Sequence, residues 1–305
     1  MATTLILDTD IGGDVDDALA LAFAIRHPDI DLRAVTTVSG DTVRRAKIAK
    51  KLLLLAGRDD VEVAAGVRGE HPERNESADG SHEAAMLGDV PDGLEISGRD
   101  AVTLLLEECE RGGVQVATVG MQSNVAAALD RDPSFAHDVE LLAVMGGVFA
   151  PVRFFGEELP PSIDHNLNVD ATAAVRALNA GFNALYTPID VTMTAWLMAP
   201  HLERLRSGDA LCRELARQID VYGRGKHWHG VIPDDHVCLV HDPLAVACMV
   251  ERRFVTTERL PVTVAMHQGH VRTFIDPVAG VEAEVVRSVN AAAVAAWWVE
   301  VVVGD

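Results

Sequence analysis

Residues 5–21 read LILDTDIGGDVDDALAL, and their pattern indicates how the chain begins to fold. A short apolar run comes first, five aspartates follow within ten residues, and an Ala/Leu-rich stretch completes the segment. The apolar run predicts a buried strand over residues 5–7, and the Ala/Leu-rich stretch predicts a helix over residues 18–25 that ends before Pro28. The aspartates therefore fall between the carboxyl end of a strand and the first turn of a helix.

Strand and helix patterns continue to alternate along the chain. Apolar, β-branched runs predict further strands at 32–38, 114–119, 141–144 and 183–186, and amphipathic stretches predict helices at 43–55, 124–129 and 171–178. This alternation is typical of an α/β fold with an open, mainly parallel sheet that helices flank on both faces. Because the chain has no internal repeat and no Ser/Gly-rich linker, we expect residues 1–305 to form a single Rossmann-like domain.

Three long segments interrupt this alternation, at residues 68–98, 149–168 and 223–240. Long loops in a compact domain are usually functional or disordered. In open α/β sheets, ligands bind beyond the carboxyl ends of the strands, where the strand order reverses. We therefore expect a ligand site at that edge of the sheet, close to the aspartates.

The composition excludes several classes of protein. The 305 residues carry a net charge of −20 and are 49% hydrophobic, which excludes a disordered chain. The acidity argues against a nucleic-acid partner or an anionic membrane, because both require clustered Lys and Arg. Four cysteines without C-x-x-C spacing favour a reducing compartment. Since the sequence also shows no signal peptide and no membrane-span pattern, we expect a cytoplasmic protein without a membrane partner.

The aspartate-rich segment predicts a metal site. Helix capping and the helix dipole explain one or two of the five carboxylates, such as Asp14 or Asp16. They do not explain Asp8 and Asp10 at a strand end, where unpaired carboxylates repel each other. A hard divalent cation removes this repulsion, and a set of oxygen ligands favours Ca²⁺ or Mg²⁺.

A pair of aspartates after the first strand is also the first motif of the haloacid-dehalogenase-like phosphatases, in which the first Asp is the nucleophile. Those enzymes continue with Thr or Val and a longer loop, whereas Ile11, Gly12 and Gly13 follow here. The Gly-Gly pair does not indicate a phosphate-binding loop, because no Lys follows and the loop is strongly anionic. A phosphatase-like hydrolase is therefore the weaker alternative.

The first segment more closely resembles the N-terminal signature of the inosine–uridine-preferring nucleoside hydrolases. Six further segments match this family in order: VTTVSG at 35–40, GMQSNVA at 120–126, VMGG at 144–147, DHNLNVD at 164–170, PIDVT at 188–192 and VHDPLAVA at 240–247. Together the segments span nearly the whole chain. The resemblance implies the nucleoside hydrolase fold and hydrolysis of the N-glycosidic bond of a ribonucleoside, which releases ribose and a free base.

The resemblance also implies a Ca²⁺ cofactor. Its ligands would be Asp10, a bidentate Asp17, the main-chain carbonyl of Ser123, and Asp242. The 2′- and 3′-hydroxyls of the sugar and the attacking water would complete the coordination shell. Asp10 would contact both the ion and the water, so we expect it to act as the general base.

Other matched residues are expected to bind the nucleoside. Asp16 and Asn166 would bind the ribose diol, and Met145 would pack under the sugar ring or simply fill the core. His241 is the candidate proton donor to the leaving base, because it titrates near neutral pH and precedes a ligand aspartate.

Two loops supply candidates for the base pocket. His82 lies in the first long loop, and His229 or His236 lies in the late one. Trp228 in the same late loop is expected either to stack on a base or to anchor the loop by packing.

Several positions depart from the family pattern. Asp14 is surplus in a first motif with two extra residues, and Ser123 replaces a Thr. Asp41 stands where the family usually has Asn. Glu158 falls near a sugar-binding Asn, and Asp164 replaces a Glu. Asp41, Glu158 and Asp164 are still expected to bind substrate, and the last two predict an altered 5′ end of the preferred nucleoside.

Two further expectations follow from the resemblance. The assembly is expected to be a homodimer or a homotetramer. The alternative to an enzyme is a non-catalytic ribose- or nucleoside-binding relative, against which the apparent retention of Asp10, Asp17, His241 and Asp242 argues. The preferred base stays open.

Overall fold

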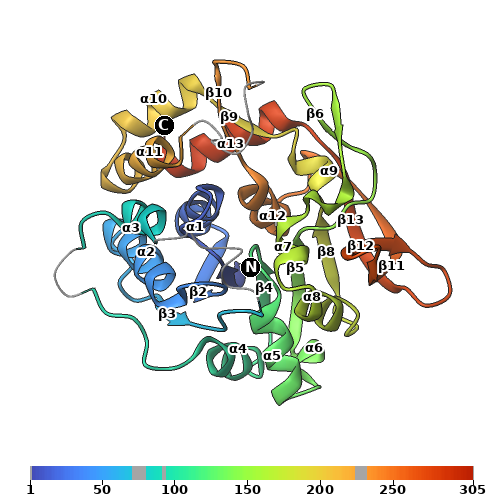
Figure 1. The fold of residues 1–305 in the computed structure, drawn as a ribbon. Helices are drawn as coiled ribbons and strands as arrows, with labels where there is room; N and C mark the ends of the chain where they lie inside the picture. Colours follow the sequence, from blue (N-terminus) through green and yellow to red (C-terminus); the bar gives the residue numbers. More distant parts are fainter. Residues whose placement is uncertain (1, 71–79, 91–93, 224–231, 305) are drawn as a thin grey trace.

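A nine-stranded sheet forms the centre of the computed structural model, which describes residues 2–70, 80–90, 94–223 and 232–304 (Figure 1). In spatial order its strands are β12 (His270–Ile275), β11 (Val255–His267), β13 (Val281–Val289), β8 (Ala184–Thr187), β5 (Val139–Met145), β4 (Val114–Thr118), β1 (Thr3–Thr9), β2 (Ile30–Thr37) and β3 (Glu62–Ala65). All neighbouring pairs from β13 to β3 are parallel, whereas β11 pairs antiparallel with both β12 and β13. The expected open, mainly parallel sheet is confirmed.

Helices cover both faces of this sheet, because its central strands are apolar on both sides. Along β1, Leu5 and Leu7 pack on one face and Ile6 packs on the other. The first face is covered by α1 (Asp16–Arg26), α2 (Thr42–Leu55), α11 (Ala210–Tyr222), α12 (His241–Val250) and α13 (Ala291–Val303). The second is covered by α4 (Ala101–Cys109), α5 (Ser123–Arg131), α6 (Phe135–Asp138) and α8 (Ala171–Leu178).

The three long segments contain short elements of their own. The first holds α3 (Ser81–Leu87), and the second holds the hairpin β6 (Val152–Phe154) and β7 (Glu157–Leu159), followed by α7 (His165–Val169). The third ends in β10 (His236–Leu239), which pairs with β9 (Trp196–Met198). The remaining helices are α9 (Ile189–Thr192) and α10 (Ala199–Ser207).

The sequence patterns located the parallel half of the sheet well. Each strand and helix expected between residues 5 and 186 is present, with ends shifted by at most a few residues. The antiparallel strands β11, β12 and β13 were not predicted. They form one edge of the sheet and project from the body of the molecule (Figure 1).

The order in which the chain adds strands to the sheet reverses beside β1. From β1 the chain proceeds outward through β2 to β3, and then returns to add β4 on the other side of β1. The carboxyl ends of β1 and β4 therefore lie at the reversal in strand order, where ligands bind in such sheets. In the described part of the chain, none of the helices combines the length and apolar content of a membrane span.

Candidate active site

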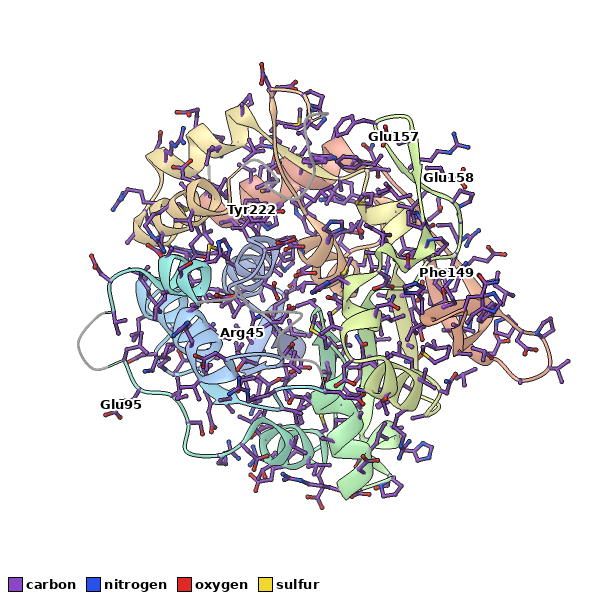
Figure 2. The ribbon with its side chains drawn as sticks, viewed as in Figure 1. Arg45, Glu95, Phe149, Glu157, Glu158 and Tyr222 are labelled. Carbon is purple, nitrogen blue, oxygen red and sulfur yellow. The ribbon has the colours of Figure 1, made fainter. Side chains whose placement is uncertain are left out.

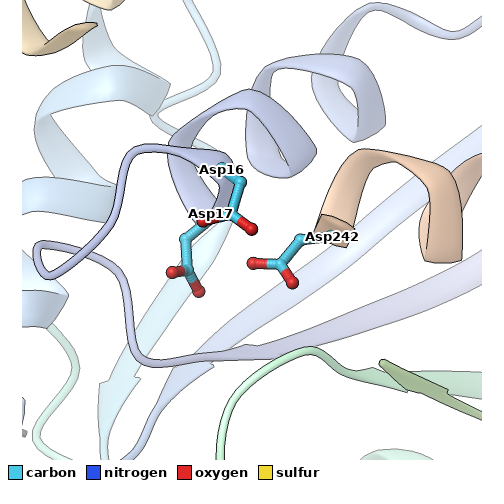
Figure 3. Close-up of side chains that lie close together, drawn as sticks. All are labelled: Asp16, Asp17 and Asp242. Carbon is cyan, nitrogen blue, oxygen red and sulfur yellow. The ribbon is translucent and has the colours of Figure 1, made fainter. Parts of the chain in front are cut away.

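Three buried aspartates from two helices meet at this edge of the sheet (Figure 3). Asp16 and Asp17 lie in the first turn of α1, and Asp242 lies in the first turn of α12. One carboxylate oxygen from each residue lies within 4.8 Å of the other two. The three residues are only 7%, 4% and 3% exposed, respectively. We refer to these three residues as the aspartate cluster.

Electrostatics show what the aspartate cluster requires. Burial raises the pKa of each of the three carboxyl groups well above its usual value, and the neighbouring carboxylates raise it further. Three ionised carboxylates at this separation need a compensating positive charge. Since every donor atom is an oxygen, the cluster fits a hard divalent cation such as Ca²⁺.

Asp10 lies beside the cluster but is not one of its three members. It follows β1 directly, is 8% exposed, and its charge raises the pKa of all three cluster aspartates. Gly120, after β4, explains how Asp10 fits there. A Cβ atom at position 120 would lie 2.7 Å from Asp10 Oδ1 and 2.9 Å from its amide nitrogen. Only glycine leaves room for this carboxylate.

A buried arginine supports the turn that carries Asp10. Arg45 of α2 is 1% exposed, and its guanidinium donates to the carbonyls of Asp10, Ile11 and Ser39. Sequence reasoning did not single out Arg45. One sequence signal could have found it. Arg45 lies three, four and seven residues before Ile48, Ala49 and Leu52, so the helical period places it on the same buried face of α2.

A second buried carboxylate, that of Asp8 in β1, links neighbouring elements by hydrogen bonds. Asp8 Oδ1 accepts hydrogen bonds from the Thr36 hydroxyl at 2.6 Å and from the Asn124 amide at 2.7 Å. Burial raises the pKa of Asp8 to about 7. Asn124 also donates to the Thr37 carbonyl and accepts from the Val67 amide. Asp8 and Asn124 thus join β1, β2 and α5 rather than facing the cluster as a pair of ligands.

Ser123, whose main-chain carbonyl is an expected ligand, lies at the start of the helix after β4. It is the first residue of α5 and is buried. Its hydroxyl donates to Asp170 Oδ2 at 2.6 Å, and Asp170 in turn caps α8 by accepting from the Ala173 amide. The side chain of Ser123 therefore fixes the start of α5 against the start of α8.

Two expected sugar contacts lie together at the end of β5. The Asn166 amide nitrogen donates to the carbonyls of Val119 and Met145, at 2.6 and 3.2 Å. It also lies 3.3 Å from the Met145 sulfur, and Met145 is 3% exposed. The amide of Asn166 is therefore held in one orientation by two strand ends.

Of three other expected substrate contacts, two have local roles in the structure. Asp41 caps α2 by accepting from the Arg44 amide. The two carboxylate oxygens of Asp164 accept from the amides of Leu167 and Gly147, and burial raises its pKa to about 6. Glu158 is exposed on β7, in the hairpin that β6 and β7 form (Figure 2), and no local role is evident for it there.

His241 lies next to a cluster member at the start of α12. Its Nδ1 lies 2.6 Å from the Thr192 hydroxyl. Desolvation lowers the pKa of the imidazole to about 4, so the ring is neutral at pH 7. It can donate a hydrogen bond in this state, but it does not carry the second proton that was expected from its ordinary titration.

The other candidates for the base pocket, His82 and His236, contact different parts of the molecule. The half-buried His82 of α3 donates through Nε2 to the Gly13 carbonyl at 2.8 Å. His236 packs edge-on against Phe155 and Trp196, with ring centroids 5.4 and 5.2 Å away. Trp228 and His229 lie outside the described residues.

The surplus Asp14 does not belong to the aspartate cluster. Its carboxylate accepts a hydrogen bond from the hydroxyl of Tyr222, the last residue of α11. Burial, together with this negative neighbour, raises the pKa of the Tyr222 phenol. Sequence reasoning missed Tyr222, because nothing in the local pattern of α11 relates it to a loop two hundred residues earlier.

Known structures share this architecture. A plant nucleoside hydrolase described as the PpNRh1 enzyme superposes with a TM-score of 0.84 at 23% identity, covering 100% of both chains. A purine-preferring ribonucleoside hydrolase from Gardnerella vaginalis also gives a TM-score of 0.84 at 23% identity, covering 99% of this chain and 98% of that one. At these identities the likeness concerns the fold.

Sequence relatives and a family model identify the family. A probable uridine nucleosidase 1 of Oryza sativa subsp. japonica is 27% identical over 267 residues, covering 84% of this chain and 79% of that protein. A pyrimidine-specific ribonucleoside hydrolase RihA of Enterobacter sp. (strain 638) is 29% identical over 269 residues, covering 84% and 82%. The model of the inosine-uridine preferring nucleoside hydrolases matches residues 5–296. The chain is therefore a hydrolase of N-glycosyl compounds and belongs to the inosine-uridine preferring nucleoside hydrolase family.

Proposed function

We propose that this protein is a Ca²⁺-dependent hydrolase of the N-glycosidic bond of ribonucleosides. The observation that carries this proposal is the aspartate cluster: three buried carboxylates of one chain meet at the reversal in strand order. A non-catalytic nucleoside-binding protein would also need a sugar site. The buried Asp10 beside the cluster would serve such a protein only as a metal ligand, whereas an enzyme would also use it as the general base.

The family resemblance, rather than the spacing of the carboxylates, suggests which residues would hold the cation, because the three carboxylates that meet are those of Asp16, Asp17 and Asp242. We assign Asp10, Asp17, Asp242 and the main-chain carbonyl of Ser123 to this role, with Asp16 directed at the sugar. When bound, Ca²⁺ supplies positive charge that favours deprotonation of a neighbouring water and orients the sugar hydroxyls.

Asp10 is the proposed general base. It is buried at the end of β1 and close enough to the cluster for its charge to act on all three members. In the reaction, the proton of the attacking water passes to the Asp10 carboxylate, the water oxygen bonds to the anomeric carbon, and the bond to the base nitrogen breaks. Positive charge that develops on the ribose is stabilised by the nearby carboxylates.

His241 is proposed to assist the leaving base as a neutral imidazole. If the Thr192 hydroxyl donates to Nδ1, the proton of the ring resides on Nε2, which then donates to the base as negative charge develops there. The low pKa of the ring keeps this neutral form dominant above about pH 4.

Asp16 and Asn166 are proposed to bind the ribose diol, with Met145 beneath the sugar ring. The amide of Asn166 is already fixed by two strand-end carbonyls, so little ordering is needed on binding. A buried polar site built for two hydroxyls discriminates strongly against a 2′-deoxy sugar.

The 5′ end and the base complete the proposal. Both carboxylate oxygens of Asp164 accept from backbone amides, so we propose that the site does not depend on the 5′-hydroxyl and accepts a nucleoside modified at the 5′ position. Relatives are named as uridine nucleosidases and as a pyrimidine-specific hydrolase, which makes uridine the first nucleoside to test. We further propose a cytoplasmic homodimer or homotetramer.

Base release from a panel of purine and pyrimidine ribonucleosides and their 2′-deoxy forms tests this function. The protein is expected to hydrolyse at least one ribonucleoside, and Asp10→Asn is expected to abolish turnover. Asp59→Asn, a change at an exposed position, serves as the matched control. Tight nucleoside binding without base release would instead identify a binding protein. Activity on a generic phosphate ester with Mg²⁺ would favour the phosphatase alternative.

A further inference from the structure

The short helix α3 is fixed at both ends by arginines that lie over glycines. Gly80 precedes the helix with φ +66°, and its carbonyl accepts from Arg44 Nη1 at 3.0 Å. Gly88 follows the helix with φ +59°. A Cβ atom at Gly80 would lie 2.6 Å from Arg44 Nη1, and one at Gly88 would lie 3.2 Å from the guanidinium carbon of Arg217. Glycine at both positions adopts the positive φ without strain and leaves room for each guanidinium.

The last carbonyls of α3 accept from two cations on two other helices. Lys51 Nζ of α2 donates to the Leu87 carbonyl at 2.7 Å. Arg217 of α11 donates to the Ala85 carbonyl at 2.7 Å and also to the Met86 carbonyl. Cationic groups at a helix C-terminus satisfy its free carbonyls and favour its dipole.

Glu214 joins these two cations. Its carboxylate lies 3.0 Å from Lys51 Nζ and 2.7 Å from Arg217 Nη2. The side chains of Lys51 and Glu214 are only 9% and 11% exposed, so solvent screens this pair weakly. Although burial raises the pKa of Glu214, hydrogen bonds from Arg217 and Lys51 hold it below its usual value. We call Lys51, Glu214 and Arg217 the ion triad.

At its other end, α3 contacts the loop that leads to the aspartate cluster. His82 donates to the Gly13 carbonyl at 2.8 Å, and Gly13 lies three residues before Asp16. Arg45 holds the preceding carbonyls of the same loop from α2. The loop between β1 and α1 is thus held from one side by Arg45 and from another by α3.

We propose that the ion triad consists of positioning residues, which set the divalent-cation affinity of the aspartate cluster by fixing α3 and, through His82, the Gly13 carbonyl. This proposal rests on the proposed function, because it assumes that the cluster binds a cation. Residues that orient metal ligands from outside the coordination shell change metal affinity by about 10- to 100-fold. The ion triad acts one step further away, so we expect a smaller effect, no larger than the lower limit of that range.

Direct titration of Ca²⁺ into the metal-free protein, by calorimetry, tests the proposal without relying on turnover. Arg217→Ala is expected to weaken Ca²⁺ binding by about 3- to 10-fold. The variant should fold, since Glu214 keeps its partner Lys51. Arg213→Ala is the matched control: Arg213 lies on the same helix and donates to the Gly208 carbonyl instead of α3. It is expected to bind Ca²⁺ as the wild type does.

A double-mutant cycle with His82→Ala separates positioning from general stabilisation. If the ion triad acts through His82, Arg217→Ala should change Ca²⁺ affinity by less than about 2-fold in the His82→Ala background. Full additivity of the two effects would overturn the proposal. Equal Ca²⁺ affinity of the Arg217→Ala and Arg213→Ala proteins would overturn it as well.

Lys51→Met provides a second variant should Arg217→Ala fail to fold, because it preserves the pair between Arg217 and Glu214. It is expected to weaken Ca²⁺ binding in the same direction, and unchanged affinity would contradict the proposal. Different results would contradict the proposed function and the proposed role of the ion triad. If the wild type shows neither Ca²⁺ binding nor nucleoside hydrolysis, the proposed function is wrong. If it shows both while the variants bind Ca²⁺ normally, only the role of the ion triad is wrong.

Discussion

Asp10 and Gly120 show how a single close contact can determine a site. The carboxylate of Asp10 occupies the space that a side chain at position 120 would fill. Gly120 follows β4, whereas Asp10 follows β1, and these two strands are neighbours in the sheet. Because the two strand ends approach so closely, the side chain that leaves β1 has little freedom.

Gly120→Ala is therefore expected to reduce kcat by about 100-fold, as a displacement of a catalytic group by about 1 Å commonly does. The added methyl would press on Asp10 and also on the buried Val38, whose Cγ1 would lie 2.9 Å away. Gly98→Ala is the control, since a Cβ at position 98 meets no atom within 4 Å. Steady-state kinetics with the best nucleoside of the panel measures the effect. Normal kcat in the Gly120→Ala protein would show that Asp10 is not held in the catalytic position by this contact.

At the level of residues, the sequence indicated the type of chemistry more successfully than it indicated which side chains contact one another. Motif position assigned Asp10, Asp17 and Asp242 to a cation and Asp16 to the sugar, whereas the three carboxylates that meet in the structure are those of Asp16, Asp17 and Asp242. Arg45 and Tyr222 were missed, because their roles depend on which helices pack against the loop after β1. Asp41 and Asp164 were expected at the substrate, and the structure places both as helix caps. Helix capping and sugar binding require the same residue type, so a sequence pattern does not distinguish them.

Among the elements, α7 carries the residues that we propose for the sugar and for the 5′ end of the substrate. Its N-cap is Asp164, and Asn166 lies within its first turn. A Glu at position 164 would have an additional methylene and reach further than the capping carboxylate does. Since the shorter Asp164 is committed to the amides of Leu167 and Gly147, the 5′-hydroxyl loses one expected partner.

We therefore expect 5′-deoxy and 5′-amino nucleosides to be hydrolysed with kcat/KM no more than about tenfold below that of the unmodified parent. A site built to hydrogen-bond a hydroxyl rejects an analogue without it by about 10⁴-fold or more. Comparing each analogue with inosine or uridine in the same release assay measures the ratio. A clear preference for the unmodified nucleoside, beyond tenfold, would remove the idea of an altered 5′ end.

The parallel elements were predictable because local pattern and tertiary role agree in them. Buried central strands read as continuous apolar runs, and each is followed by an amphipathic helix. The strands β11 and β12 form an exposed edge, where Phe274 and Ile275 are exposed and polar residues mix with apolar ones. Such edge strands give a weak sequence signal, so the antiparallel part of the sheet could not be located in advance.

Across the whole molecule, buried carboxyl groups govern how stability depends on pH. In the folded chain without a cation, the pKa of Asp8 is about 7 and that of Asp164 is about 6, and the aspartate cluster is raised as well. In the unfolded chain these groups lose their protons near pH 4. Between these values the folded state binds more protons, so the free energy of unfolding falls as the pH rises. His27, His201 and His241, whose pKa values are lowered by burial, have the opposite effect, which ends above their unfolded value of about 6.5.

The metal-free protein should accordingly melt at a higher temperature at pH 5.5 than at pH 8. Saturating Ca²⁺ should raise the melting temperature at pH 8 and reduce the difference between the two pH values, because a ligand at about 100 times its Kd adds about 3 kcal/mol to the free energy of unfolding. Calorimetric melting in chelator and in Ca²⁺ at both pH values provides the data. A metal-free melting temperature that falls on acidification would contradict the assignment of these buried acids.

The most direct test of the central claim is the rate of ribose release from uridine and inosine before and after chelation, followed by addition of Ca²⁺ or Mg²⁺. The cluster of Asp16, Asp17 and Asp242 predicts that chelation abolishes release and that Ca²⁺ restores it more effectively than Mg²⁺. Hydrolysis that proceeds undiminished in the chelated protein would contradict a cation-dependent nucleoside hydrolase.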